Sequence, residues 1–279
     1  MLRFKYIHLY LNPAKTLDIN SIAYEVARFF PYCQIDIRLP FLSSNNISDK
    51  IAENLASIRV PDIKRPFYDQ LERGQKRPNI GDIIFERNLV MPTTSNENPN
   101  YRLYDGFMMQ RLLEEMLSEK ETPSDHVHIV FEDRLICTFG EDDWRYHARA
   151  LICGTPSIIS TTGIIEAPAK PKEWYLKKLF HQFSICETDT IEEEKEKTWK
   201  RELAGKYIID SKDYRISSVA VGYVLQALFF FLSDGNPFCN DNNCRLFNAH
   251  WQEDLMHSQI QTNELCKRHT LLLHEFNKK

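Results

Sequence analysis

The chain has 279 residues, 43% hydrophobic and 27% charged, which is ordinary for a globular protein and enough for one large domain or two modest ones. The formal net charge of −4, without a visibly basic face, argues against nucleic-acid binding. Seven cysteines are an odd number, and Met1 to Lys5 leads into a strand-like pattern rather than a secretory signal. We therefore expect a reducing, cytoplasmic setting in which thiols can bind metal.

The N-terminal part of the chain alternates strands and helices. Residues 4–11 are dense in aromatic and β-branched side chains and predict a first strand, and residues 33–39 alternate apolar with polar side chains and predict a second. Between them we expect a helix capped by Asn20 or Ser21, and a further helix over residues 48–58. A strand, a helix and a strand suggest a right-handed crossover in an α/β layer.

The middle of the chain predicts more strands around a helix. Residues 82–90 favour a strand, residues 105–119 a helix, residues 126–131 a central strand, and residues 148–153 and 157–161 two further strands. His126 and His128 lie two residues apart, on one face of the central strand. Two histidines placed in this way can hold a metal, although structural histidines with hydrogen-bond partners are commoner.

The segment that follows carries helical patterns. Residues 173–183 are amphipathic, residues 187–202 form a charge run typical of a solvated helix face, and residues 207–209 suggest a short strand. Residues 216–232 contain no charge, but they are slightly few for a membrane span and include Ser217, Gly222 and Gln226. We predict a helix buried in the protein core, and no membrane association.

The most specific pattern lies near the C-terminus. Cys239 and Cys244 are separated by four residues, and Cys266 and His269 by two. Two short ligand pairs joined by a connector are typical of a closed structural zinc site, because each pair can bind one ion from a tight turn. We therefore predict one structural Zn²⁺ on Cys239, Cys244, Cys266 and His269. The alternatives for the fourth ligand are His250, His257 and His274, and the plainer alternative is that these cysteines are small buried hydrophobes.

The same residues carry a family resemblance. The chain resembles the archaemetzincins, zinc peptidases of the metzincin type, and an archaeal family described as metallopeptidases. The archaemetzincin signature is His-Glu-x-x-His-x-x-Gly-x-x-His-Cys, then x4-Cys, and later Cys-x-x-Cys. Cys239 and Cys244 match its second-zinc half, and Cys266 and His269 match the final pair with His in place of the last Cys. The resemblance implies an α/β fold with a mixed sheet flanked by helices over residues 1–238, and a zinc-stapled helical segment, 239–279, packed on it.

The chain departs from the catalytic half of that signature. Counted back from Cys239 without gaps, Leu228, Leu232 and Phe238 stand where the family has its zinc histidines, and Phe229 stands where it has the catalytic Glu. The sequence contains no His-Glu-x-x-His motif. We therefore expect a degenerate peptidase site and a binding or scaffold role. The partner is not identified by the sequence; one option is an extended peptide paired with a sheet edge near residues 157–162.

The alternative is a metal-dependent hydrolase or peptidase that uses a relocated metal site. Three suitable side chains converging beside a cleft would favour that alternative. The candidates are His126, His128, His147, Glu132, Asp133, Glu166, His250 and His257.

Overall fold

One mixed sheet organises the computed structural model, which describes residues 4–11, 17–42, 47–67, 78–89, 102–176, 208–211 and 213–278. Its strand order is β2 (Gln34–Arg38), β1 (Tyr6–Tyr10), β4 (His126–Glu132), β8 (Ser157–Ser160) and β7 (Leu151–Ile152). The first four strands are parallel, and β7 runs antiparallel to β8. The predicted mixed sheet and its central strand at His126 are thus confirmed.

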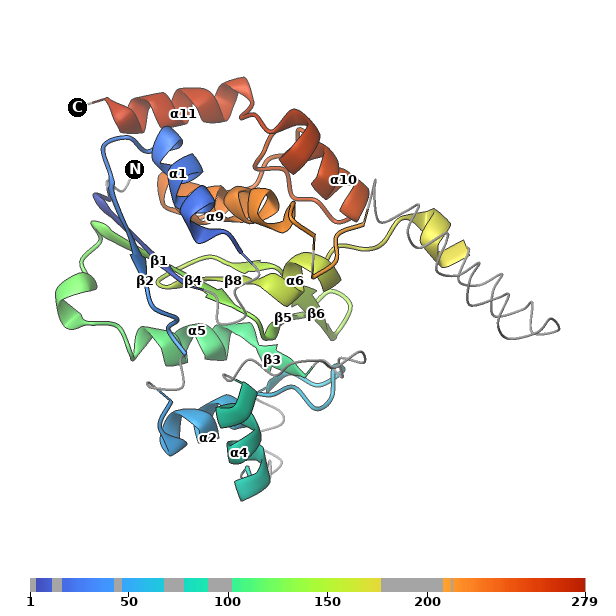
Figure 1. Ribbon diagram of the computed structural model, residues 1–279. Helices are drawn as coiled ribbons and strands as arrows, with labels where there is room; N and C mark the ends of the chain where they lie inside the picture. Colours follow the sequence, from blue (N-terminus) through green and yellow to red (C-terminus); the bar gives the residue numbers. More distant parts are fainter. Residues whose placement is uncertain are drawn as a thin grey trace.

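Helices cover both faces of this sheet (Figure 1). On one face, α1 (Ile19–Phe29) and α9 (Ile216–Leu232) share a buried core with side chains of β1 and β4 such as Leu9 and Ile129. On the other face, α5 (Gly106–Glu114) and α2 (Asp49–Ser57) pack with Tyr10, Val130 and Ile158. The alternation of side chains along each strand produces these two separate cores.

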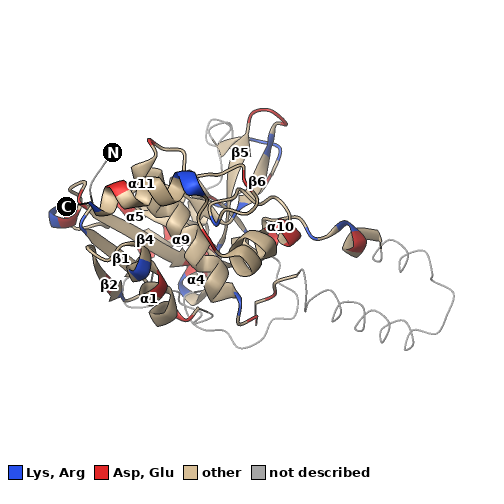
Figure 2. Ribbon diagram, turned by 90° about the horizontal axis from the view of Figure 1, so that it is seen from above, with Lys and Arg blue, Asp and Glu red and all other residues tan. Residues whose placement is uncertain are grey.

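A smaller sheet and the remaining helices complete the described structure. The order of the small sheet is β3 (Leu103–Asp105), β5 (Leu135–Gly140) and β6 (Arg145–Arg149). Further elements are η1 (Glu119–Glu121), α4 (Ile80–Leu89), α6 (Thr161–Glu166), α10 (Gln252–Met256), the π-helix η2 (His257–Thr262) and α11 (Lys267–Asn277). Lys, Arg, Asp and Glu are scattered over the surface of the described residues (Figure 2).

Helix α9 is buried as the sequence predicts. Its side chains from Val219 to Phe229 are all buried, and so is Leu232. No described helix combines the length and hydropathy that a membrane crossing needs. The apolar side chains of α9 are therefore used inside the protein, where the helix packs against α1, α6, η2 and the main sheet.

Two predicted strands and one predicted cap are wrong. The sequence predicts a strand over residues 82–90, but α4 covers residues 82–89, because Asn79 and Asp82 exchange side-chain-to-N–H hydrogen bonds that start a helix. Helix α1 is capped by Asp18 rather than Asn20 or Ser21, since the Asp18 carboxylate accepts from the N–H of Ser21. Residues 208 and 209 are not in a strand.

The proposed peptide-binding edge is also wrong. Strand β8, within the segment 157–162, pairs with β4 on one side and β7 on the other, so it is an interior strand. Thr161 and Thr162 continue into α6, capped by Ser160. The predicted helix 173–183 lies mostly outside the described residues, although residues 172–176 are helical, and the charge run 187–202 lies wholly outside them.

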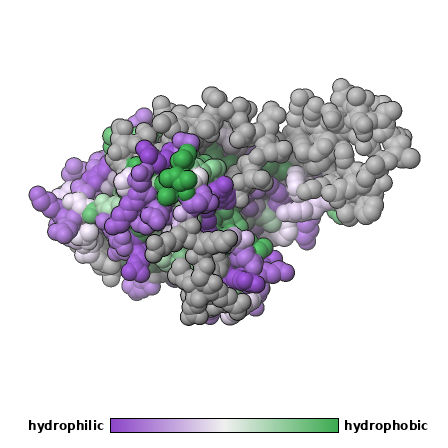
Figure 3. All heavy atoms as spheres, turned by 90° about the horizontal axis from the view of Figure 1, so that it is seen from below, coloured by the Kyte–Doolittle hydropathy of each residue, from purple (hydrophilic) through white to green (hydrophobic). Residues whose placement is uncertain are grey.

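The face that carries α2 and α4 is mostly hydrophilic with a small apolar area (Figure 3). On α4, the side chains of Ile80 and Ile84 are exposed four residues apart. The inner side of the same helix combines Ile83, which packs against the core, with a charge, because Glu86 is fully buried and bonded to two arginines. The buried charge and the exposed isoleucines weaken the amphipathic pattern, so the sequence of α4 does not predict a helix.

Candidate metal centre

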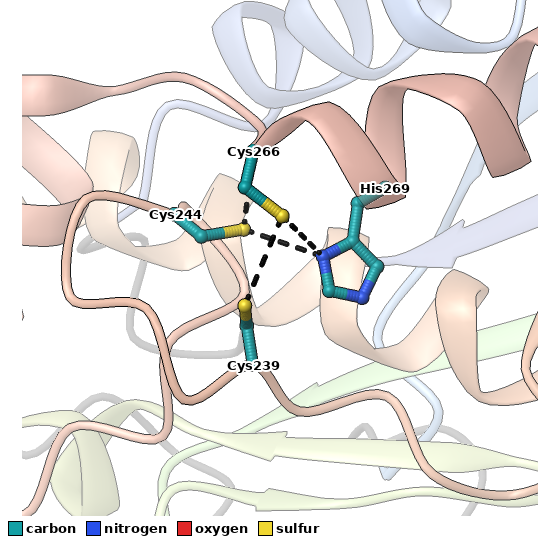
Figure 4. A group of neighbouring side chains, drawn as sticks. All are labelled: Cys239, Cys244, Cys266 and His269. Carbon is teal, nitrogen blue, oxygen red and sulfur yellow. Dashed lines mark hydrogen bonds between the residues drawn. The ribbon is translucent and has the colours of Figure 1, made fainter.

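Three thiols and one imidazole converge beside the start of α11. Figure 4 shows Cys239, Cys244, Cys266 and His269 pointing toward one another, and their ligand atoms all lie within 4.8 Å of one another. The Sγ atoms of Cys239 and Cys266 are 3.9 Å apart, and His269 Nδ1 lies 3.5 Å from Cys244 Sγ and 3.1 Å from Cys266 Sγ. In tetrahedral zinc sites the S···S and S···N edges are about 3.8 Å and about 3.6 Å, so the spacing suits one ion.

The first ligand pair is presented by a turn just after α9. The helix ends at Leu232 with Ser233 as its C-cap, and Gly235 takes a left-handed conformation (φ 86°), which lets the chain reverse toward Cys239. Within the four-residue loop, the N–H of Cys244 donates to the carbonyl of Asp241. The polar, turn-forming loop residues therefore bring the two thiols of the C-x4-C pair together, as the sequence suggests.

The second pair uses the first turn of α11. Cys266 is the N-cap residue of this helix, and His269 lies three positions later on the same side. The connector that returns the chain contains α10 and η2, and the N–H of Arg245 donates to the carbonyl of Glu264 near its end. Backbone geometry at both ends of the connector thus brings the pairs together.

Peptide N–H groups point at the sulfur atoms. The N–H of Asp241 donates to Cys239 Sγ and the N–H of Cys266 donates to Cys244 Sγ, both at 3.4 Å. Burial is the largest influence on the thiols: it raises the pKa of Cys239, and it raises the pKa of Cys244 to about 12. For Cys266, burial is outweighed by hydrogen bonds, above all from the N–H of His269, and the pKa is lowered. N–H donors of this kind stabilise thiolates, the form that binds metal.

Helix α9 contributes packing to this cluster and no ligand of its own. Phe229 contacts the imidazole of His269 edge to face, with ring centroids 5.6 Å apart. Leu228 and Leu232 are buried in the same core. Three of the four positions where the resemblance places catalytic groups therefore carry buried apolar side chains, and the fourth, Phe238, is apolar and exposed.

One side of α9, which carries Ser218, Gly222 and Gln226, contacts the cysteine loop and the connector that follows it. Arg245, buried next to Cys244, donates from its guanidinium to the carbonyl of Ser218 (3.0 Å), and Gln226 donates to the carbonyl two residues after Arg245 (3.1 Å). Burial lowers the pKa of Arg245 to about 10. Between these contacts, a Cβ atom on Gly222 would lie 1.7 Å from Oε1 of Gln259, so the close approach requires glycine. These contacts are not predicted by the sequence. The only feature that indicates them is the regular spacing of Ser218, Gly222 and Gln226, which places the three residues on one side of a helix.

A second group of ligand-type side chains lies on the opposite face of the sheet. Ligand atoms of His8, Glu121 and His128 also lie within 4.8 Å of one another. His8 is bonded through Nδ1 to the carboxylate of Asp36 and through Nε2 to Nδ1 of His126 (2.8 Å). Both ring nitrogens of His8 thus have partners already.

The rest of this group is bonded in the same way. His128 lies between the hydroxyl of Tyr10 (3.1 Å from Nδ1) and the carbonyl of Glu121 (2.8 Å from Nε2). The Glu121 carboxylate accepts two hydrogen bonds from Arg38, at 2.6 and 2.7 Å. Burial lowers the pKa of His128 to about 4. The group is a hydrogen-bonded network, as expected for structural histidines, although it retains the composition of a metal site.

The other candidates for a relocated metal site are dispersed. His147 pairs with Asp143, Glu132 with Arg134, Asp133 with Thr161, and His257 with Asn243. Of the eight candidates, only His128 belongs to one of the two groups of ligand-type side chains found in the described part of the chain. No three of the eight candidates converge in the described part of the chain.

No curated protein matches the chain. Among solved structures, the chain is similar to the archaemetzincin from Methanopyrus kandleri, with 9% identity, a TM-score of 0.45 and coverage of 99% of this chain and 97% of that chain. A family model described as "Probable metallopeptidase family (DUF6775)" matches residues 3–276, which confirms the predicted resemblance to a metallopeptidase family. The chain belongs to this metallopeptidase-like family.

Proposed function

We propose that this chain binds one structural Zn²⁺ through Cys239, Cys244, Cys266 and His269. The convergence of these four ligand atoms within 4.8 Å carries the proposal. Three thiolates and one imidazole form a complete tetrahedral set that suits Zn²⁺ and leaves no position for water or substrate. Zinc at this site supplies stability and no catalysis. His269, and not His250, His257 or His274, is the fourth ligand in this proposal.

We infer that the family's peptidase chemistry is lost in this member and that the protein has a binding or scaffold role. A catalytic zinc needs nitrogen or oxygen ligands on one helix face and a carboxylate that takes a proton from bound water. Leu228, Phe229 and Leu232 supply neither, and all three are buried. The domain boundary between residues 238 and 239 remains a prediction; side chains from both sides share one core.

The test of this function is the zinc content of the purified full chain, together with its activity on a peptide panel. We expect one zinc per chain, a loss of most of it in Cys266→Ser and His269→Ala, and no zinc-dependent cleavage. His257→Ala and Cys33→Ser are the matched controls and should keep one zinc. Two zinc ions per chain, with cleavage that is lost in Leu228→Ala and retained in Cys239→Ser, would contradict the proposal.

The second candidate function is a hydrolase with a relocated metal. The one observation that favours it is the group of His8, Glu121 and His128, whose ligand atoms are close enough to hold an ion. A second metal there would have to replace the bonds to Tyr10, Arg38 and His126. It predicts a second bound ion that is lost in His128→Gln, while the ion at Cys239 is kept.

A further inference from the structure

The edge of the main sheet is formed by β2. This strand pairs with β1 on one side, and no described strand pairs with it on the other. The register with β1 places Asp36 beside His8 and Arg38 beside Tyr10. An unpaired edge strand presents a row of free N–H and C=O groups, so it can accept another strand.

The main-chain hydrogen bonds between β2 and β1 show which residues of β2 have N–H and C=O groups that point away from the sheet. The N–H of Gln34 donates to Lys5, and the carbonyl of Arg38 accepts from Leu11, so the main chain of the even-numbered residues faces β1. Because these directions alternate along a strand, the main-chain groups of Ile35, Ile37 and Leu39 point away from the sheet.

The side chains of β2 also alternate. Asp36 and Arg38 lie on the face that carries the histidine network, and they are bonded to each other at 2.8 Å. Ile35 and Ile37 lie on the face of α1. Ile37 is 40% exposed and Leu39, just after the strand, is 78% exposed, so apolar side chains stand free at this edge.

One antiparallel register makes this edge complementary to itself. A two-fold axis can pass through a residue whose N–H and C=O point outward, which then forms a hydrogen-bonded pair with its own copy, or through an inward-pointing residue, which then stands opposite its own copy without such bonds. An inward-pointing axis at Asp36 or Arg38 would place like charges opposite each other, which is unfavourable. With the axis at Ile37, Asp36 of each copy stands opposite Arg38 of the other, and Ile35 stands opposite Leu39. An axis at Ile35 or Leu39 would place no opposite charge of the copy across from Asp36 or Arg38.

We propose that β2 pairs antiparallel with β2 of a second copy of this chain, about a two-fold axis at Ile37. Ile37 pairs with Ile37 of the copy and Ile35 with Leu39 of the copy, and each pair exchanges two main-chain hydrogen bonds. The two Asp36–Arg38 pairs fall at the closer, non-hydrogen-bonded positions, where opposite charges stabilise pairing. The exposed ring of Tyr32, two residues before β2, adds apolar area at the same edge.

The first test measures the mass of the full chain by sedimentation over a range of concentrations. We expect a concentration-dependent dimer. Ile37→Pro removes an outward N–H while leaving the bonds to β1 in place, and should weaken dimerisation at least about tenfold. Leu39→Lys should do the same, and Leu271→Lys, at an exposed apolar site on α11, should not. A monomer at every concentration would overturn the proposal.

The second test fixes the register and does not depend on how well Ile37→Pro folds. In the proposed pairing the two Ile37 Cα atoms are about 5.5 Å apart, within disulfide range, whereas the two Leu39 Cα atoms are more than about 10 Å apart. Mild oxidation should therefore cross-link Ile37→Cys into a covalent dimer and leave Leu39→Cys uncross-linked, with the parent chain as control for the native cysteines. A dimer in which Leu39→Cys cross-links and Ile37→Cys does not would exclude this interface.

Discussion

Phe229 packs edge-on against His269, with ring centroids 5.6 Å apart and planes at 87°. Phe229 belongs to α9 and His269 to α11, so this contact joins the central helix to the candidate metal centre. Phe229 also meets Phe30 of the main core, with ring centroids 6.4 Å apart. Phe229 thus supports the proposed ligand from within the main core.

Removal of this ring should weaken both the core and the metal site. Phe229→Ala is expected to lower the free energy of unfolding by about 3–5 kcal/mol, because it leaves a cavity in a closely packed core. Zinc affinity should fall by roughly 10–100-fold, since His269 loses a contact that orients it. Phe238→Ala, one residue before Cys239, is the control because Phe238 is exposed; its effect should be within about 0.5 kcal/mol. Equal unfolding midpoints for the two variants in urea would contradict this prediction.

Zinc removal should loosen one part of the chain more than the rest. Chelation, or Cys266→Ser, is expected to speed hydrogen exchange first in residues 239–266, whose turns are held by the proposed ion. Phe276 on α11 should protect the helix end, since its ring lies 4.7 Å from Phe4 and 5.5 Å from Phe30. The main sheet should keep its protection. Unchanged exchange in residues 239–266 after chelation would mean that no ion holds this segment.

The parts of the fold that the sequence predicts are those with a strong local pattern. Strands β1, β2 and β4 and helices α1, α2 and α9 follow from their hydrophobic spacing, and the ligand cluster follows from the spacing of Cys239, Cys244, Cys266 and His269. Each ligand pair could be predicted because its two residues lie close together in the sequence. That the two pairs, which are distant in the sequence, share one ion is inferred from the four ligands that a structural zinc ion requires.

The remaining features depend on contacts that are far apart in the sequence. Helix α4 has an irregular hydrophobic pattern because Glu86 is buried against Arg59 and Arg134, and neither arginine is near it in the chain. The position of β8 inside the sheet depends on the return of β7 beside it. The partner of His126 is His8, 118 residues away. Local periodicity contains no information on such pairings.

Glu86 leads to a prediction about stability. It is fully buried and accepts from Arg59 (2.7 Å), Arg134 (3.0 Å) and the hydroxyl of Tyr104 (2.8 Å). Glu86→Gln should lower the free energy of unfolding by about 3–5 kcal/mol, because it leaves two guanidinium groups with less opposing charge. Asp49→Asn breaks the exposed pair with Arg87 and should cost at most about 1 kcal/mol. Denaturant titrations of both variants check the contrast, and similar losses for the two would contradict it.

The histidine network leads to a prediction about pH. Burial lowers the pKa of His8 and lowers that of His128 to about 4, whereas an unfolded histidine titrates near 6.5. Between these values the unfolded chain binds more protons than the folded one, so stability must rise with pH in that window and fall as the solution is acidified from about 6.5 to 4. Glu121 stays ionised throughout, since its hydrogen bonds to Arg38 lower its pKa to about 2.

Substitution of His128 should remove part of this dependence. His128→Gln can still donate to the carbonyl of Glu121 and accept from Tyr10, but it cannot take up a proton. Its unfolding midpoint should therefore fall less than that of the parent chain between pH 6.5 and pH 4.5, by roughly 1–2 kcal/mol in free energy. His147→Gln is the control, because His147 is half-exposed and bonded to an exposed Asp143, and it should follow the parent profile. Loss of zinc at low pH affects all three chains alike, so the difference between the two variants isolates His128. Parallel pH profiles for all three would show that His128 does not resist protonation in the folded protein.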